Sequence, residues 1–240
     1  MEIFTSFMLT SIAGISTCLG YLFTYIRSKN IDKYICILLS FAMGVMILIS
    51  IKELIPIPLK YIFLKHNLST FLTILIAIPV IILIIINRLN NKLKISNSLY
   101  RVGVLNTISM IFHNVLEGII TFFTTLSNFN LGFKLSLAIM AHNIPEGISI
   151  AIPIYFGSNN RVKSLIYTLI AGLSEVFGAL LFYLIFKEKI NIDILNIIFY
   201  AIGCLMITIS IKEILPEVLK YNNKIWIVIG LLFSLFILII

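Results

Sequence analysis

The segment LGFKLSLAIMAHNIPEGISIAIPIY, residues 131–155, places His142, Asn143 and Glu146 in the middle of an otherwise apolar stretch of 25 residues. A helix of that length spans the hydrocarbon core of a bilayer, which takes about 20 residues. A second apolar segment, residues 103–126, carries the related hexapeptide HNVLEG. An ionised group at mid-membrane depth costs at least about 2.5 kcal/mol to bury. The pattern therefore predicts membrane helices that carry a functional polar site.

The composition agrees with a membrane location for the whole chain. Of its 240 residues, 60% are hydrophobic and 12% are charged, with a mean hydropathy of +1.10. Soluble domains average about 25% charged residues. The formal charge of +8 comes from 18 Lys and Arg against 10 Asp and Glu. In a membrane protein such an excess usually lies in cytoplasmic loops, so we expect no nucleic acid as partner.

Apolar runs of membrane length recur along the chain and predict an all-α polytopic membrane protein with eight transmembrane helices. The connections between them are short, so residues 1–240 are expected to form a single transmembrane domain. The expected spans are residues 3–26, 35–55, 69–86, 103–126, 131–155, 163–186, 193–214 and 225–240.

The positive charges indicate how these spans are oriented. The odd connections, which follow the first, third, fifth and seventh spans, hold eleven Lys and Arg residues, and the even connections hold five. Because cytoplasmic loops are enriched in Lys and Arg, we expect a multi-pass protein of the cell membrane with the odd connections in the cytoplasm and both termini outside. The odd set is Arg27, Lys29, Lys33, Arg88, Lys92, Lys94, Arg101, Arg161, Lys163, Lys220 and Lys224, and the even set is Lys60, Lys65, Lys134, Lys187 and Lys189.

An internal repeat links the second span to the seventh. MILISIKELIPIPLKY at residues 46–61 aligns without gaps to MITISIKEILPEVLKY at residues 206–221, and eleven of sixteen positions are identical. The two copies lie five spans apart and therefore run in opposite directions, which is typical of transporters built from inverted repeats. Glu53 and Glu213, the equivalent carboxylates, are expected at the outer and inner mouths of a path. Ordinary pairing with Lys52 and Lys212 is the alternative.

The two hexapeptides supply the candidate ligands of a metal site. On a helix, residues i and i+4 lie on one face with i+1 beside them, so each hexapeptide directs its His, Asn and Glu at one point. A further carboxylate, Glu175, lies at mid-depth of the sixth span. Imidazole and carboxylate donors together predict a divalent metal, and a metal-free hydrogen-bonded cluster is the alternative. The candidate ligands are His113, Asn114, Glu117, His142, Asn143, Glu146 and Glu175.

The two hexapeptides on successive spans, the glutamate on the next span and the eight-span pattern resemble the ZIP (Zrt/Irt-like) family of divalent metal transporters. The likeness covers essentially the whole chain, is greatest to the bacterial zinc-uptake subgroup, and is most specific at AHNIPEGISIAIP. It implies spans divided three, two and three, with inverted repeats at about 1–86 and 163–240 around central helices at 103–155. Leu116 stands where the family usually has proline, so the fourth span is expected to lack the matching kink.

The same resemblance implies a binuclear site. The first metal would be held by His113, Glu117, His142 and Glu146, and the second by Asn114, Asn143 and Glu175, with Glu117 and Glu146 bridging. It also implies alternating access, in which the fourth and fifth spans move against the outer repeats.

We therefore expect a secondary transporter that carries divalent transition metals into the cytoplasm, with the metal as substrate and no cofactor. The donor set suits Zn²⁺, Fe²⁺, Mn²⁺ or Cd²⁺, and Zn²⁺ is expected first. None of the three cysteines has a metal-binding spacing. The alternative is an enzyme, an intramembrane zinc hydrolase that activates water, but the H-E-x-x-H pattern is absent. Membrane lipid surrounds the chain, and a homodimer remains open.

Overall fold

A computed structural model describes residues 2–26, 29–93, 95–185 and 192–237. This part of the chain is helical and has no strand, which confirms the all-α prediction. Seven helices are long and apolar enough to cross a membrane, and the shorter apolar helix Lys224–Phe236 follows them. Some sequence predictions fall outside the described residues, namely the charges Arg27, Lys94, Lys187 and Lys189 and the span ends at 186 and 238–240.

Most predicted spans agree with the helices to within about five residues, but the second continues beyond residue 55 to Lys65 and the third continues beyond residue 86 to Leu93. The helices are α1 (Glu2–Ser16) with a 3₁₀ continuation (Thr17–Tyr25), α2 (Ile31–Ile49), α3 (Pro56–Lys65), α4 (Leu68–Leu93), α5 (Ser98–Ser127), α6 (Phe129–Ser158), α7 (Arg161–Ile185), α8 (Ile192–Ile209), α9 (Leu215–Leu219) and α10 (Lys224–Ile237).

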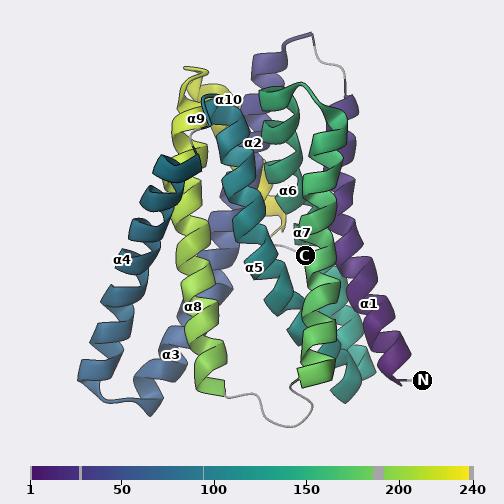
Figure 1. Ribbon diagram of the computed structural model, residues 1–240, viewed down its shortest axis with the longest axis vertical. Helices are drawn as coiled ribbons and strands as arrows, with labels where there is room; N and C mark the ends of the chain where they lie inside the picture. Colours follow the sequence, from purple (N-terminus) through teal and green to yellow (C-terminus); the bar gives the residue numbers. More distant parts are fainter. Residues whose placement is uncertain (1, 27–28, 94, 186–191, 238–240) are drawn as a thin grey trace.

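Successive spans alternate in direction (Figure 1). We call the end at which α5 and α7 begin the upper end, and the end at which α4, α6 and α8 begin the lower end. The amino terminus lies at the lower end (Figure 1). Asparagine side chains accept hydrogen bonds from the first backbone N–H groups of α2, α5 and α6, which satisfies donors that a helix start leaves free. These caps are Asn30, Asn97 and Asn128.

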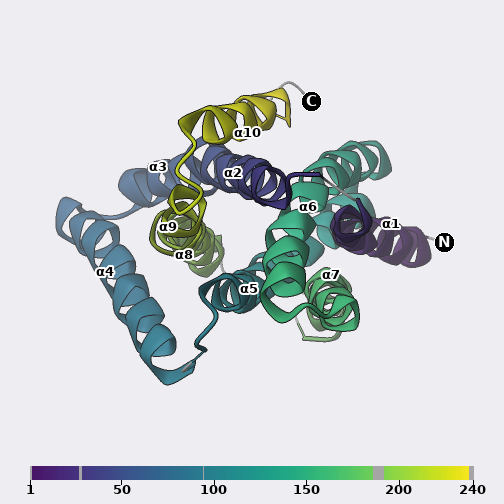
Figure 2. The ribbon, with the colours of Figure 1, turned by 90° about the horizontal axis from the view of Figure 1, so that it is seen from above.

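Seen from above, the helices form two groups (Figure 2). The four-helix bundle consists of α1 with its 3₁₀ continuation, α5, α6 and α7, which all contact one another. The flanking helices are α2, α3, α4, α8, α9 and α10, and α2 packs against both α6 of the bundle and α10. Large buried side chains fill the interior of both groups, among them Met46, Met110, Ile150 and Met206.

The internal repeat has a matching backbone feature in both copies. A π-type turn, in which an N–H bonds to the carbonyl five residues back, occupies Ser50–Leu54 in one copy and Ser210–Ile214 in the other. The N–H of Ile55 donates to the Ser50 carbonyl at 3.0 Å, and the N–H of Leu215 donates to the Ser210 carbonyl. A proline follows each turn at the start of the next helix. The two copies run in opposite directions (Figure 1).

Candidate metal centre

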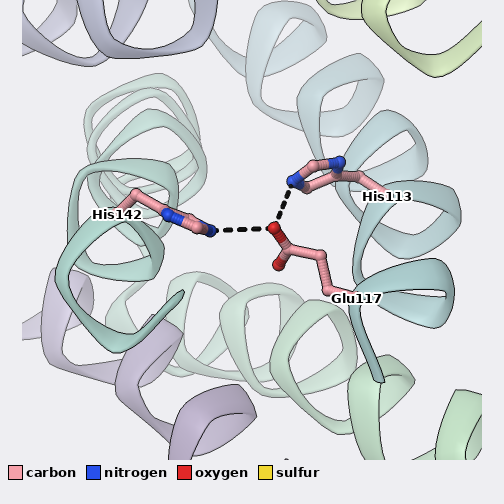
Figure 3. Close-up of side chains that lie close together, drawn as sticks. All are labelled: His113, Glu117 and His142. Atoms are coloured by element: carbon pink, nitrogen blue, oxygen red, sulfur yellow. Dashed lines mark hydrogen bonds and ion pairs between the residues drawn. The ribbon is translucent and has the colours of Figure 1, made fainter. Parts of the chain in front are cut away.

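Two histidines from neighbouring helices face one carboxylate (Figure 3). The Nε2 atom of His142 on α6 lies 2.8 Å from Glu117 Oε1, and Nε2 of His113 on α5 lies 2.9 Å from the same oxygen. Glu146 joins this group, because its Oε1 lies 3.3 Å from His113 Nε2. Ligand atoms of His113, Glu117 and His142 all lie within 4.8 Å of one another. The structure thus brings together the four residues expected around a first metal.

The other three candidate residues lie on the same helices and on α7. Asn143 Nδ2 donates to Glu175 Oε2 at 3.0 Å and to the Ala13 carbonyl of α1 at 3.0 Å. Asn114 Nδ2 donates to the Ala171 carbonyl of α7 at 2.8 Å. Asn143 and Glu175 are therefore in contact, and Asn114 reaches the helix that carries Glu175 one turn before that residue.

The nitrogen and the oxygen of each asparagine side chain have different roles in this arrangement. In each asparagine the NH₂ group is bonded to a carbonyl of a neighbouring helix, α7 for Asn114 and α1 for Asn143. The amide oxygens of both are buried and have no hydrogen-bond partner in the described structure. The NH₂ bonds therefore fix the side chains with their oxygens free to accept.

The buried carboxylate oxygens that lack a hydrogen bond in the described part of the chain all belong to this cluster. Among the described residues, one carboxylate oxygen of Glu117, both of Glu146 and one of Glu175 also lack a hydrogen bond. A buried acceptor left unpaired costs about 1–3 kcal/mol, and more when it is charged. Several such oxygens beside two imidazole nitrogens form a donor set that a divalent cation satisfies.

The glycine that ends each hexapeptide permits the close packing of the bundle. A methyl group on Gly118 would overlap the backbone carbonyl of Glu175 on α7, and one on Gly147 would overlap the carbonyl of Thr17 at the start of the 3₁₀ continuation of α1. Only glycine lets helices approach this closely. Each hexapeptide thus has its own partner helix, with α7 against α5 and α1 against α6.

Leu116 is buried in α5, which runs without a break from Ser98 to Ser127. α6 contains Pro145 and Pro153 and is also helical from Phe129 to Ser158. The absence of proline at position 116 therefore does not prevent Glu117 from facing His142.

A cavity of about 470 Å³ leads from the lower end to this cluster. It lies between the four-helix bundle and the flanking helices, and His142 and Glu117 contribute to its wall. The other polar side chains in its wall are Glu53 from the first π-type turn and Asn196 from α8. Asn196 was not predicted as a site residue, because a single asparagine in an apolar span does not indicate which way its side chain faces.

The upper end holds a different polar group. Glu213, whose side chain is 4% exposed, lies 3.7 Å from Arg101 Nε and accepts a hydrogen bond from Asn90 Nδ2. Lys212 instead donates to Asn87 Oδ1 at 2.9 Å. The alternative that Glu213 pairs with Lys212 is therefore wrong. The pairing with Arg101 could not be predicted from the sequence, because the two residues are far apart in the chain and belong to different spans.

His66, the third histidine, does not take part in the cluster. It lies near the lower end, with its Nε2 atom 3.9 Å from Asp193 Oδ1. The same carboxylate accepts a hydrogen bond from the Tyr61 hydroxyl and forms an ion pair with Lys65.

Comparison with known proteins finds a family model and several similar proteins, all of which are named as zinc transporters. A model of the ZIP zinc transporter family matches residues 90–239. The zinc transporter ZupT of Clostridium perfringens is 26% identical over an alignment that covers 96% of this chain and 92% of that protein. The ZupT proteins of Streptococcus mutans and Salmonella arizonae are 29% and 30% identical, covering 92% and 90% of this chain and 90% and 88% of theirs.

Proposed function

Since this chain belongs to the ZIP zinc transporter family, we propose that it moves Zn²⁺ into the cytoplasm through the cluster around His113 and His142. Family membership makes the chain a divalent metal transporter of the multi-pass membrane class and not an enzyme, so the metal is its substrate. The intramembrane hydrolase is not favoured.

The observation that carries the proposal is the set of buried acceptor oxygens without donors at the cluster. A site that only stabilised the fold would pair its polar groups internally, because unpaired buried acceptors are costly. A cation of charge two would contact several of these oxygens and both imidazoles. The mixed donor set also suits a transported ion, which must leave again, better than a closed site of four thiolates.

Two metal ions fit the distribution of the donors. The first would contact His113, Glu117, His142 and Glu146, where the N···O distances are 2.8–3.3 Å. The second would contact Glu175 and the free oxygens of both asparagines, with Glu117 and Glu146 shared between the ions. The pairing of Asn143 with Glu175 at 3.0 Å supports this second set.

The donor set limits the choice of metal but does not select a single ion. Imidazole and carboxylate suit Zn²⁺, and also Fe²⁺, Mn²⁺ and Cd²⁺. The names of the relatives favour Zn²⁺. The cluster contains no thiolate, which disfavours Cu⁺.

In the proposed orientation the lower end faces the outside of the cell membrane and the upper end faces the cytoplasm. The charge distribution in the connections supports this assignment. The cavity then receives ions from outside, and the polar group at Glu213 closes the cytoplasmic end. Alternating access would move the cluster from one end to the other.

The moving unit in this proposal is the four-helix bundle. The sequence suggested the fourth and fifth spans alone, but α1 and α7 pack closely on both. Glycines at the contacts of α5 with α7 and of α6 with the 3₁₀ continuation of α1 bring these backbones into direct contact, so the four helices would move together. The inverted repeats at about 1–86 and 163–240 would then each contribute one helix to the bundle, α1 and α7, and the remaining helices to the flanking group.

The test is metal accumulation by sealed vesicles that contain the purified chain. Radioactive zinc should accumulate inside, and an excess of unlabelled Zn²⁺ should abolish its uptake more effectively than Mn²⁺ or Fe²⁺. If Mn²⁺ or Fe²⁺ competes better than Zn²⁺, the choice of metal is wrong. If no divalent metal enters vesicles that contain folded protein, the assignment of the cluster to transport is wrong.

A further inference from the structure

At the upper end a few polar contacts join the four-helix bundle to the flanking helices. Arg101, in the first turn of α5, lies 3.7 Å from the Glu213 carboxylate in the second π-type turn. Next to this pair, Lys220 Nζ donates to Ser98 Oγ of α5 at 2.7 Å and forms an ion pair with Glu217 at 2.6 Å. Side chains in the first turn of α5 thus contact side chains of the residues that come after α8 in the chain.

In the lower half of the molecule, the equivalent carboxylate of the repeat has a different environment. Glu53 occupies the same position of the first π-type turn as Glu213 does in the second. Its side chain lines the cavity beside Glu117 and His142, and no ion pair with it is found among the described residues. One carboxylate of the repeat is therefore open to the cavity, while its counterpart is covered.

The charge of Arg101 explains how Glu213 can be buried. An ionised carboxylate that is 4% exposed is costly without a nearby positive charge or hydrogen-bond donors. Arg101 and Asn90 supply both. In the orientation of the proposed function a metal ion would leave at this end, and the positive charge of Arg101 would repel it.

Arg101 is rigidly connected to the metal cluster. It precedes His113 on α5 by twelve residues, about 18 Å along one unbroken helix. A displacement of α5 that carries His113 toward the upper end must also move Arg101 relative to Glu213, which belongs to the flanking helices.

We propose that Arg101 is a positioning residue of the transport cycle, whose ion pair with Glu213 holds the upper end closed while the cavity at the lower end is open. This inference rests on the alternating access of the proposed function. When the bundle moves, Arg101 leaves Glu213, the repulsion of the cation ends, and the freed carboxylate attracts the metal as it leaves the cluster.

The test uses two reporter cysteines in a background without native cysteines that still takes up zinc. Ala138→Cys reports the cavity at the lower end. Ser210→Cys reports the upper end, where Ser210 is fully buried one turn before Glu213. Each is labelled by a membrane-impermeant thiol reagent in vesicles of known orientation. Zinc should change the two labelling rates in opposite directions if the protein alternates.

Arg101→Gln should raise the labelling rate at position 210 by about fivefold, the order expected for loss of a partly exposed ion pair. The rate at position 138, measured in vesicles of the opposite orientation, should fall, because the two states exchange population. Glu213→Gln should have the same effect while it keeps an oxygen to accept from Asn90. The exchanged pair, Arg101→Glu with Glu213→Arg, should restore both rates.

Arg161→Gln is the matched control. Arg161 is also at the upper end, but its contacts with Thr24, Tyr25 and Tyr155 all lie within the four-helix bundle. It should leave the ratio of the two rates unchanged.

Two outcomes would overturn the role of Arg101. One is a rise at position 210 without a fall at position 138, which indicates local loosening. The other is no change in either rate. If zinc itself leaves both rates unchanged in the parent protein, alternating access is wrong, and the role of Arg101, which depends on it, is wrong as well.

Discussion

Glu53 and Glu213 occupy the same position of two π-type turns that run in opposite directions, yet Glu53 lines a cavity and Glu213 is buried against Arg101 and Asn90. The repeat therefore has a common backbone and two different side-chain environments. This difference is what is expected of a symmetrical pathway that is open at one end only.

Glu53 should assist capture of the metal and contribute little to its final binding. A carboxylate in a hydrated cavity attracts a cation by about 1 kcal/mol or less. We expect Glu53→Ala to raise the zinc concentration for half-maximal uptake about two- to fivefold, most clearly at low salt. Initial uptake rates over a range of zinc concentrations measure this. Glu53→Gln keeps the size of the side chain and should behave like the alanine variant, and wild-type behaviour of both would exclude a role in capture.

Glu213→Ala should act on the maximal rate of uptake instead. Without this carboxylate, the upper end loses both the partner of Arg101 and a group that attracts the departing ion. Metal bound to the purified protein in detergent should be unchanged, because Glu213 is not part of the cluster. Loss of bound metal in this variant would place Glu213 in the central site and contradict separate roles for the two carboxylates.

Glu175→Gln should reduce the bound zinc from two ions per chain to one. The substitution removes the charge of a fully buried carboxylate that contacts Asn143, and leaves the side-chain volume nearly unchanged. Elemental analysis of the purified protein gives the stoichiometry. Thr168→Ala is the control, since in the described part of the chain the buried Thr168 hydroxyl bonds to the carbonyls of Ser164 and Leu165 on the same helix, and it should keep two ions. An unchanged stoichiometry in Glu175→Gln would show that the second site is built from other residues.

The sequence contained most of what was needed to locate the cluster. Helical spacing within each hexapeptide predicts that His, Asn and Glu share a face, and the structure joins the two faces through Glu117. Most span boundaries could be predicted from hydropathy, because hydropathy, like helical spacing, is a property of a short stretch of sequence. The second span was predicted to end at residue 55 but continues through Pro56 to Lys65. Proline is tolerated in the first turn of a helix, and α3 begins there.

Contacts between distant parts of the chain could not be predicted in the same way. Nothing near Arg101 in the sequence indicates Glu213, and nothing near Gly147 indicates Thr17. These contacts depend on how whole helices are placed. The π-type turns were also missed, although the repeated proline after each of them is a local signal that a regular helix is interrupted.

The packing of Gly147 gives a test of the bundle itself. Gly147→Ala would place a methyl group against the Thr17 backbone of α1, and overpacking of this kind costs about 1–3 kcal/mol. The variant should therefore unfold at a lower temperature in detergent. At Gly203 the atoms nearest to an added methyl are Cγ1 of Ile55 and Cβ of Leu54, at 2.8 and 2.9 Å, whereas at Gly147 the Thr17 carbonyl oxygen lies closer to the added methyl than either of these, so Gly203→Ala should be milder. Equal stability of both variants and the parent would contradict the close approach of α1 and α6.

The most direct test of the metal cluster compares two histidines of the same chain. His142 contacts Glu117 within the cluster, whereas His66 lies near Asp193 at the lower end. Zinc uptake into vesicles should fall to background in His142→Ala, because loss of one ligand removes several kcal/mol of metal binding, on the order of a hundredfold or more in affinity. His66→Ala should retain uptake within about twofold of the parent. Parental uptake by correctly folded His142→Ala protein would contradict transport through this cluster.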